Sequence, residues 1–142
     1  MSWSYEITTG RLFDPAGALA GTGYAGGEMG LRPEAVNNPD YVDQRNVGPL
    51  PPGDYIMVWG IHHPRLGPGA IELIPKPSNT MYGRGGFFMH GDNLAKPGQR
   101  AGSDGCIVQE NTTRAGADAS EDRLLRVVPF WQPTTTRDID GP

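Results

Sequence analysis

The sequence predicts a mainly β domain, built as a curved mixed sheet or sandwich with one or two short helices. Three observations lead to this prediction. Apolar residues make up 37% of the 142 residues, which is enough for one core. The 21 Gly and 14 Pro lie between short apolar runs such as YIMVWGI, AIELI and GGFFMH, as turns lie between strands. The first residues alternate between apolar and polar, which is the period of a half-buried strand.

Strands are expected wherever such a run or alternation lies between turn residues. Trp3, Tyr5 and Ile7 form the first strand, and Thr9-Gly10 makes a turn before a hairpin partner at 11–13. The same reasoning predicts five more strands, at residues 18–24, 55–61, 70–74, 86–90 and 124–128.

The segments between these strands read as turns, loops and one helix. Residues 25–49 form a long irregular stretch, which is uncommon unless it has a role such as lining a site. A polar loop is expected at 92–102, and His62-His63-Pro64 predicts a turn after a strand. Asn111 is expected to cap a short helix that ends near Ser120. Residues 1–131 are therefore predicted to form one domain, and 132–142 a flexible tail.

Charge and composition exclude several classes of function. The net charge is 12 − 16 = −4, with only two lysines, so we expect neither nucleic acid nor anionic lipid as a partner. No apolar run approaches the ~20 residues that span a bilayer, so membrane insertion is not expected. The opening MSWSYEITTGRL lacks the features of a secretory signal, so we expect synthesis in the cytoplasm without one.

The lone cysteine, Cys106, lies in a glycine-rich turn, 16 residues after His90 at the end of an apolar run. A thiol needs a nearby base to attack a carbonyl carbon at neutral pH, and an imidazole supplies one. Gly105 would let the backbone turn tightly, and the amides of Gly105 and Cys106 are candidate donors to an oxyanion. Ser103 would hydrogen-bond within the turn or toward the histidine. Taken alone, a single cysteine is more often a small buried residue than a nucleophile.

The combination of these residues resembles a known signature. His90-Gly91 followed by Ser103-Asp104-Gly105-Cys106 resembles the motif of the L,D-transpeptidases, and the segment Leu50–Ile56 (LPPGDYI) is similar to a second segment of that family. Further matches resemble the type VI secretion L,D-transpeptidase effectors and extend the likeness over residues 3–128. They are WSYE, TGRL, GYAG, NNP, YGRGGF and HGD.

This resemblance implies an L,D-transpeptidase-like fold and a cysteine enzyme that acts on peptidoglycan stem peptides and needs no cofactor. Cys106 would attack the carbonyl of the diamino acid and expel D-alanine, and His90 would serve as base and then acid. Water would resolve the thioester as a carboxypeptidase, and a free D-amino acid would resolve it by exchange. The implied partners are the type VI secretion machinery and a cognate immunity protein, and the implied place of action is the periplasm of a target bacterium.

Two departures from the family pattern affect the site. Asp104 stands where many members carry His, and a carboxylate beside the thiol would raise its pKa. Ile107-Val108-Gln109 replaces the residues that usually follow the cysteine, which leaves the contact to the substrate carboxylate open. Arg84 is the first candidate for this contact, since its planar fork suits a carboxylate, and Arg114 is a weaker one. The remaining candidate substrate-binding residues are Tyr82, Gly91, Asp92 and Asp104.

Two other interpretations remain at this stage. His62, His63, His90, Asp92 and Cys106 are ligand types that zinc accepts, although their spacing matches no zinc motif. A wall-binding or interaction module on the same fold would need no thiol, and a role within a prophage or toxin fusion is also open.

Overall fold

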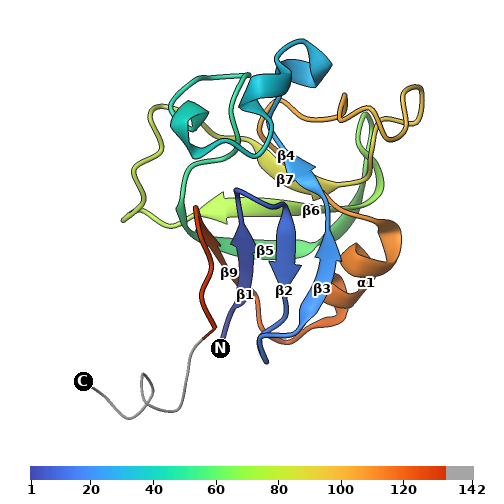
Figure 1. Ribbon diagram of the computed structural model, residues 1–142. Coiled ribbons are helices and arrows are strands. Elements are labelled where there is room, and N and C mark those ends of the chain that lie inside the picture. The colour runs from blue at the N-terminus through green and yellow to red at the C-terminus, as the bar shows by residue number, and fades with distance from the viewer. Residues whose placement is uncertain (134–142) are drawn as a thin grey trace.

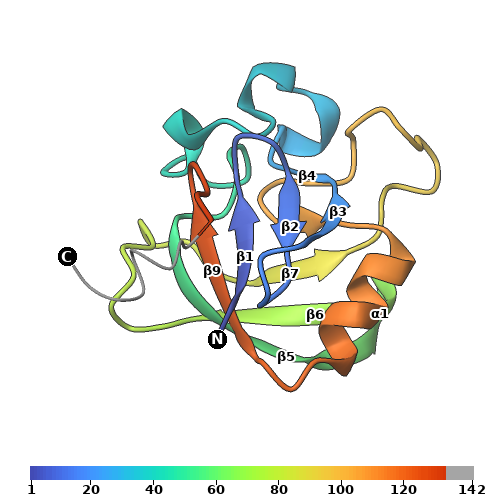
Figure 2. The same cartoon turned by 60° about the horizontal axis from the view of Figure 1, so that its bottom comes forward.

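The computed structural model describes residues 1–133 and shows one sheet that curls until its two edges come close (Figures 1 and 2). Along the chain its strands are β1 (Trp3–Glu6), β2 (Arg11–Phe13), β3 (Leu19–Thr22), β4 (Tyr24–Ala25), β5 (Gly53–His63), β6 (Gly67–Pro75), β7 (Phe87–His90), β8 (Ile107–Val108) and β9 (Leu124–Val128). Their order across the sheet is β3-β2-β1-β9-β5-β6-β7-β8-β4. The pairs β1–β9 and β7–β8 are parallel and the others antiparallel, which confirms the predicted curved mixed sheet.

The two edge strands of the sheet are neighbours in the chain, and Gly23 alone separates them. The Gly23 amide donates to the carbonyl of Gly10 at 2.7 Å. A Cβ on Gly23 would lie 1.7 Å from the carbonyl oxygen of Val108, and one on Gly10 would lie 1.9 Å from the oxygen of Gly23. Only glycine allows backbones to approach this closely, so these positions permit the curl.

The core lies inside the curl and is built by every second residue of the strands, on the face that points inward. Met57 lies opposite Leu73, and Ile71 lies opposite Met89, which in turn lies opposite Ile107. These side chains are 0–2% exposed, and burying each contributes about 1.5–3 kcal/mol. Because strand residues alternate between faces, His90 faces away from this core.

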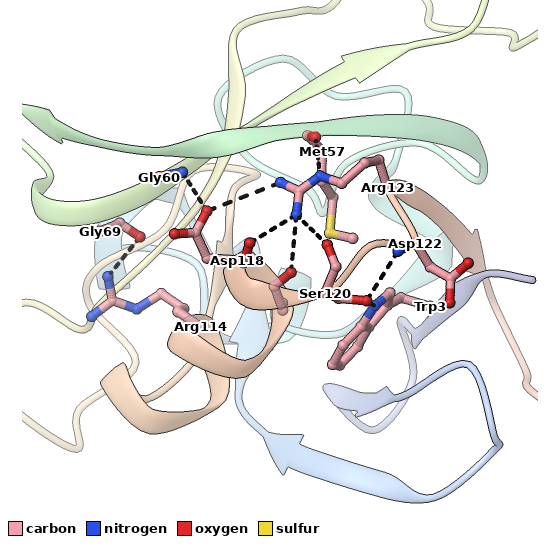
Figure 3. Close-up of polar contacts among 10 residues, drawn as sticks. Trp3, Met57, Gly60, Gly69, Arg114, Asp118, Ser120, Asp122 and Arg123 are labelled. Carbon is pink, nitrogen blue, oxygen red and sulfur yellow. Dashed lines mark hydrogen bonds and ion pairs between the residues drawn. The ribbon is translucent and has the colours of Figure 1, made fainter.

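The helix α1 (Asn111–Ala119) is held by the chain that follows it (Figure 3). Arg123 Nη1 donates to the carbonyls of Ala117, Asp118 and Ser120 at 3.2, 3.0 and 3.0 Å, which satisfies free groups at the end of the helix. Asp118 Oδ1 accepts the amide of Gly60 at 2.6 Å and so ties the helix to β5. Nine residues form a marginal helix in water, so these contacts stabilise it.

Several predicted boundaries are wrong. The helix N-cap is Glu110 rather than Asn111, which is the first helical residue. β5 continues through His62 and His63, and the turn begins after them, because His63 still pairs with Gly67 of β6. The long stretch 25–49 contains three short 3-10 helices, at Glu28–Gly30, Pro33–Ala35 and Pro39–Tyr41.

The predicted tail lies mostly outside the described residues, which end at Pro133. Just before that point, the ring of Trp131 stacks on Phe13 with centroids 3.7 Å apart. Within residues 1–133, no helix has the length and apolar character needed to cross a membrane.

Candidate active site

The turn that precedes Cys106 is packed so tightly that position 105 requires glycine. Gly105 has φ +153°, and a Cβ there would lie 2.7 Å from both Arg84 Nη2 and the ring of Phe87. The Gly105 carbonyl accepts the amide of Leu50 at 3.0 Å, which joins the turn to the segment before β5. The glycine thus serves close packing behind the thiol.

Ser103 organises this turn from the inside and is 1% exposed. Its hydroxyl donates to the carbonyl of Cys106 at 2.6 Å and accepts the amides of Gly105 and Gly26 at 3.0 and 2.9 Å. Of the two alternatives predicted for Ser103, hydrogen bonds within the turn are the ones the structure contains. Because the Gly105 amide is already bonded to Ser103, it does not point freely to an oxyanion; the amide of Cys106 stays a candidate.

Cys106 immediately precedes β8, and its thiol is held in the protonated form. Its Sγ accepts the amide of Phe88 at 3.3 Å, and the residue is 8% exposed. Burial raises the pKa of the Cys106 thiol to about 11; the Asp104 carboxylate raises it as well, while the Phe88 amide and Arg84 lower it. If this thiol acts as a nucleophile, it therefore needs a proton acceptor at the moment of attack.

His90 is held in the form that can accept that proton. Its Nδ1 lies 2.7 Å from the carbonyl oxygen of Gly91. A carbonyl only accepts, so Nδ1 carries the hydrogen and Nε2 keeps its lone pair. Burial lowers the pKa of His90 and Arg114 lowers it further, whereas the bond to Gly91 opposes them, and the net shift is downward. The imidazole is therefore neutral at pH 7.

The sheet register places these two residues close together. β7 and β8 are parallel, with Met89 opposite Ile107 and His90 opposite Val108. The same register puts Cys106 opposite Phe88, in agreement with the bond from the Phe88 amide to Sγ. Cys106 and His90 then share one face of adjacent strands as diagonal neighbours, a spacing that long side chains bridge. Within residues 1–133, Sγ makes no hydrogen bond to the ring, and such bonds often tighten only when substrate binds.

A pocket of about 380 Å³ opens beside His90. His90 lines this pocket together with residues from three segments: the turn that joins β5 to β6, the loop at 91–102 that follows β7, and the 25–49 segment. These residues are Met29, Arg65, Leu66, Gly67, Gly91, Asp92, Asn93, Leu94, Ala95 and Gly102. Cys106 does not line it. A larger pocket, of about 530 Å³, lies between the N-terminal strand and residues 126–133 and contains neither cysteine nor histidine.

Asp92 anchors the loop beside this pocket. Its Oδ1 accepts the hydroxyl of Tyr24 at 2.5 Å and the amide of Asn93 at 2.8 Å, and its Oδ2 accepts the amide of Gly98 at 3.0 Å. Burial would raise the pKa of Asp92, but these bonds hold it below its ordinary value. Tyr24 in turn accepts the amide of Gly102 at 2.8 Å. The carboxylate thus fixes both ends of the 92–102 loop.

Arg84, predicted to bind a substrate carboxylate, is occupied elsewhere. It is 7% exposed, and its guanidinium donates to backbone carbonyls of the chain that surrounds it. These acceptors are Val42 at 2.6 Å, Gly48 and Pro49 at 2.8 Å, and Asp104 at 3.3 Å. Arg114 is also buried, and it donates to the carbonyls of Gln109, Pro68 and Gly69. Both arginines hold loops in place. Arg84 keeps little capacity for a ligand, whereas among the described residues Nη2 of Arg114 makes no hydrogen bond and lies near Gly91.

The other predicted residues are placed as follows. Tyr82 is 53% exposed and has φ +56°, so its side chain projects into solvent. Gly91 and Asp92 line the pocket, while the charge of Asp104 acts on the thiol. In the part of the chain that the structure describes, no group of three or more His, Cys, Asp or Glu is placed to hold a metal. Sequence reasoning missed Tyr24, Phe88 and Arg65, because their roles depend on partners far away in the chain.

Comparison with known proteins gives one finding. A family model, the Tlde1 domain, matches residues 30–128, which is 99 of the 142 residues. Neither the search of curated proteins nor the search of solved structures finds a match. The matched range includes Arg84, His90, Ser103 and Cys106. It begins after the first four strands, so the similar segments noted before residue 30 lie outside it.

Proposed function

Because the chain belongs to the Tlde1 domain family, which by its name comprises type VI secretion L,D-transpeptidase effectors, we propose that it trims peptidoglycan stem peptides by cysteine-dependent acyl transfer. The observation that carries the proposal is the neutral His90, with Nε2 unprotonated, on the same face as the thiol of the neighbouring strand. The proposed product is a tripeptide stem, made from a tetrapeptide by loss of D-alanine.

In the first half-reaction the thiol proton moves to His90 Nε2 as Sγ bonds to the carbonyl carbon of the diamino acid. The tetrahedral intermediate then collapses, the carbon–nitrogen bond breaks, and Nε2 returns the proton to the leaving amine of D-alanine. Because the thiol pKa is about 11, attack and proton transfer are expected to occur together rather than from a preformed thiolate. The amide of Cys106 is the proposed donor to the oxyanion.

In the second half-reaction an acceptor resolves the thioester. Water gives a carboxylate product and restores the thiol, with His90 accepting the proton from the water. A free D-amino acid gives an exchanged peptide by the same steps, with its amine in the place of water. Both outcomes remove the tetrapeptide donors that cross-linking needs.

The experiment that tests this function uses purified muropeptides. We expect the protein to release D-alanine from tetrapeptides, and to incorporate a free D-amino acid when one is supplied, as weighed by mass spectrometry. Cys106→Ala is expected to abolish both products while circular dichroism and the melting temperature stay close to those of the parent protein. Cleavage that persists in Cys106→Ala would exclude the thiol as nucleophile.

The wall-binding module is the second candidate. A binding module needs no histidine tautomer fixed beside a thiol, so the geometry favours the enzyme. If wild-type protein binds isolated walls but produces no Cys106-dependent product, the binding module is the better account.

Delivery and partners form part of the proposal. The protein is proposed to be made in the cytoplasm, exported by type VI secretion, and active in the periplasm of the target cell. Its producer would need an immunity protein that covers the site, and the 25–49 segment beside the Cys106 turn is the proposed contact. Cross-linking of the two proteins would test this, since a map without contacts at 25–49 contradicts the proposed contact.

A further inference from the structure

The pocket beside His90 has a defined position relative to the thiol. Along β7, Phe88 marks the level of Cys106, His90 comes two residues later, and the pocket residues 91–95 follow. The imidazole therefore lies between the level of the thiol and the level of the pocket. A peptide attacked at Cys106 would pass His90 before it entered this space.

The chemistry of the proposed reaction determines which part of the peptide enters the pocket beside His90. The same Nε2 that accepts the thiol proton must return it to the leaving amine, so the leaving amine lies at the imidazole. Whatever is bonded to that amine then extends beyond His90, into the pocket. If the leaving residue ends the chain, its α-carboxylate lies only two bonds from the amine.

Two charged side chains line the pocket, Arg65 and Asp92. The carboxylate of Asp92 already accepts three hydrogen bonds, from Tyr24 and from two amides of its own loop. Arg65 is exposed, and within residues 1–133 its guanidinium makes no hydrogen bond or ion pair. It is therefore the exposed cation that lines this pocket; Arg114, whose Nη2 lies near Gly91, is buried and does not line it.

The backbone that carries Arg65 is held in place. His63 Nδ1 accepts the amides of both Arg65 and Leu66 at 3.1 Å, and the His63 ring packs edge-on against Phe88 at 5.0 Å. Phe88 is the residue whose amide contacts the thiol. The turn that presents Arg65 is thus tied to the strand that carries His90.

We propose that the pocket beside His90 binds the leaving amino acid, and that Arg65 binds its free α-carboxylate. This rests on the proposed function and adds the basis of specificity. The enzyme would release only a residue that ends a peptide chain, since an internal residue carries an uncharged amide there. The same pocket would take a free D-amino acid as acceptor, with its amine at Nε2 and its carboxylate at Arg65, because exchange reverses the release step.

The test compares a tetrapeptide with its C-terminal carboxamide, which differ in this one charge. We expect wild-type protein to prefer the acid by about 10-fold or more in kcat/KM, the size of a charge-assisted hydrogen bond. In Arg65→Gln the acid-to-amide ratio should fall to within about threefold of one, and Arg65→Lys should keep an intermediate ratio. Arg11→Gln, an exposed arginine on β2 outside this pocket, should keep the wild-type ratio. An unchanged ratio in Arg65→Gln would overturn the assignment.

A binding measurement separates this inference from the proposed function. The Cys106→Ala protein, with and without Arg65→Gln, is titrated with the uncleaved acid and amide peptides. Tighter binding of the acid that disappears with Arg65→Gln supports the pocket even if wild-type protein proves inactive. Equal binding of acid and amide by the Cys106→Ala protein overturns the carboxylate site, whatever the activity.

Discussion

The Nδ1 atom of His90 lies 2.7 Å from the carbonyl oxygen of Gly91, the next residue in the chain. This contact fixes the tautomer through the backbone, since within residues 1–133 no carboxylate is hydrogen-bonded to the ring. Burial meanwhile keeps the imidazole neutral. Two adjacent residues, His90 and Gly91, thus supply the neutral imidazole that the proposed mechanism uses as its general base.

The first prediction concerns the acid side of the pH profile. His90 must be neutral to accept the thiol proton, and burial lowers its pKa, so protonation and loss of activity begin only at lower pH. We expect the acid limb of kcat/KM for D-alanine release to fall below the ordinary histidine value of about 6.5. Circular dichroism at each pH checks that the protein remains folded. An acid limb above pH 7 would contradict the neutral buried base.

The second prediction concerns the reactivity of the free thiol. Burial holds the Cys106 pKa at about 11, so alkylation by iodoacetamide should keep accelerating above pH 9 in wild-type protein. A thiol that is activated before substrate arrives would behave differently: its alkylation rate would already be at its maximum well below pH 9. Asp104→Asn removes a charge that raises this pKa and should speed alkylation severalfold at pH 8. Asp40→Asn, an exposed carboxylate that is not among the charges acting on the thiol, is the control and should change little.

The third prediction concerns Arg84 as a structural residue. Arg84→Met should lower the free energy of unfolding by about 3 kcal/mol or more, because buried carbonyls of the 42–49 segment lose their donor. Urea denaturation measures this, and the exposed Arg11→Met should stay within about 0.5 kcal/mol. An Arg84→Met protein of unchanged stability with a raised KM would restore Arg84 as a carboxylate ligand.

The fourth prediction pairs two glycines with opposite outcomes. Gly105→Ala places a Cβ 2.7 Å from Arg84 and Phe87 at a left-handed φ, so it should destabilise the protein by about 2 kcal/mol or more. Gly116 lies within α1 with nothing within 4 Å of its missing Cβ, so Gly116→Ala should stabilise by about 0.5–1 kcal/mol. Thermal unfolding of both variants checks the pair. Equal effects would show that the turn before the thiol is not tightly packed.

The local sequence pattern predicted most of the strands, but it did not predict that the two edges of the sheet come close together. The alternation at Trp3, Tyr5 and Ile7 and the run that begins at Tyr55 show which residues form strands, since periodicity is a local property. That β3 and β4 lie at opposite edges of one sheet depends on contacts of Gly23 with Gly10 and Val108. Such contacts join residues that are distant in the chain and leave no mark in the local pattern.

The candidate site was likewise predicted only in part from the sequence. The His-Gly and Ser-X-Gly-Cys segments indicated the candidate thiol and base, because each segment is short and chemically specific. The sequence could not show which arginine is free to bind a ligand, since it does not reveal whether a guanidinium is surrounded by backbone carbonyls or by solvent. Arg84 meets the carbonyls of Val42 and Pro49, and Arg65 meets open space next to His90. Only the folded chain distinguishes these surroundings.

The most direct test of the central claim is the mass of the protein itself. Wild-type protein is mixed with tetrapeptide muropeptide, quenched in acid within milliseconds to seconds, and weighed intact and after digestion. We expect a transient acyl adduct of the tripeptide stem on Cys106, which forms as D-alanine is released and disappears as product accumulates. Release of D-alanine with no adduct on Cys106, at the same rate in wild-type and Cys106→Ala protein, would contradict it.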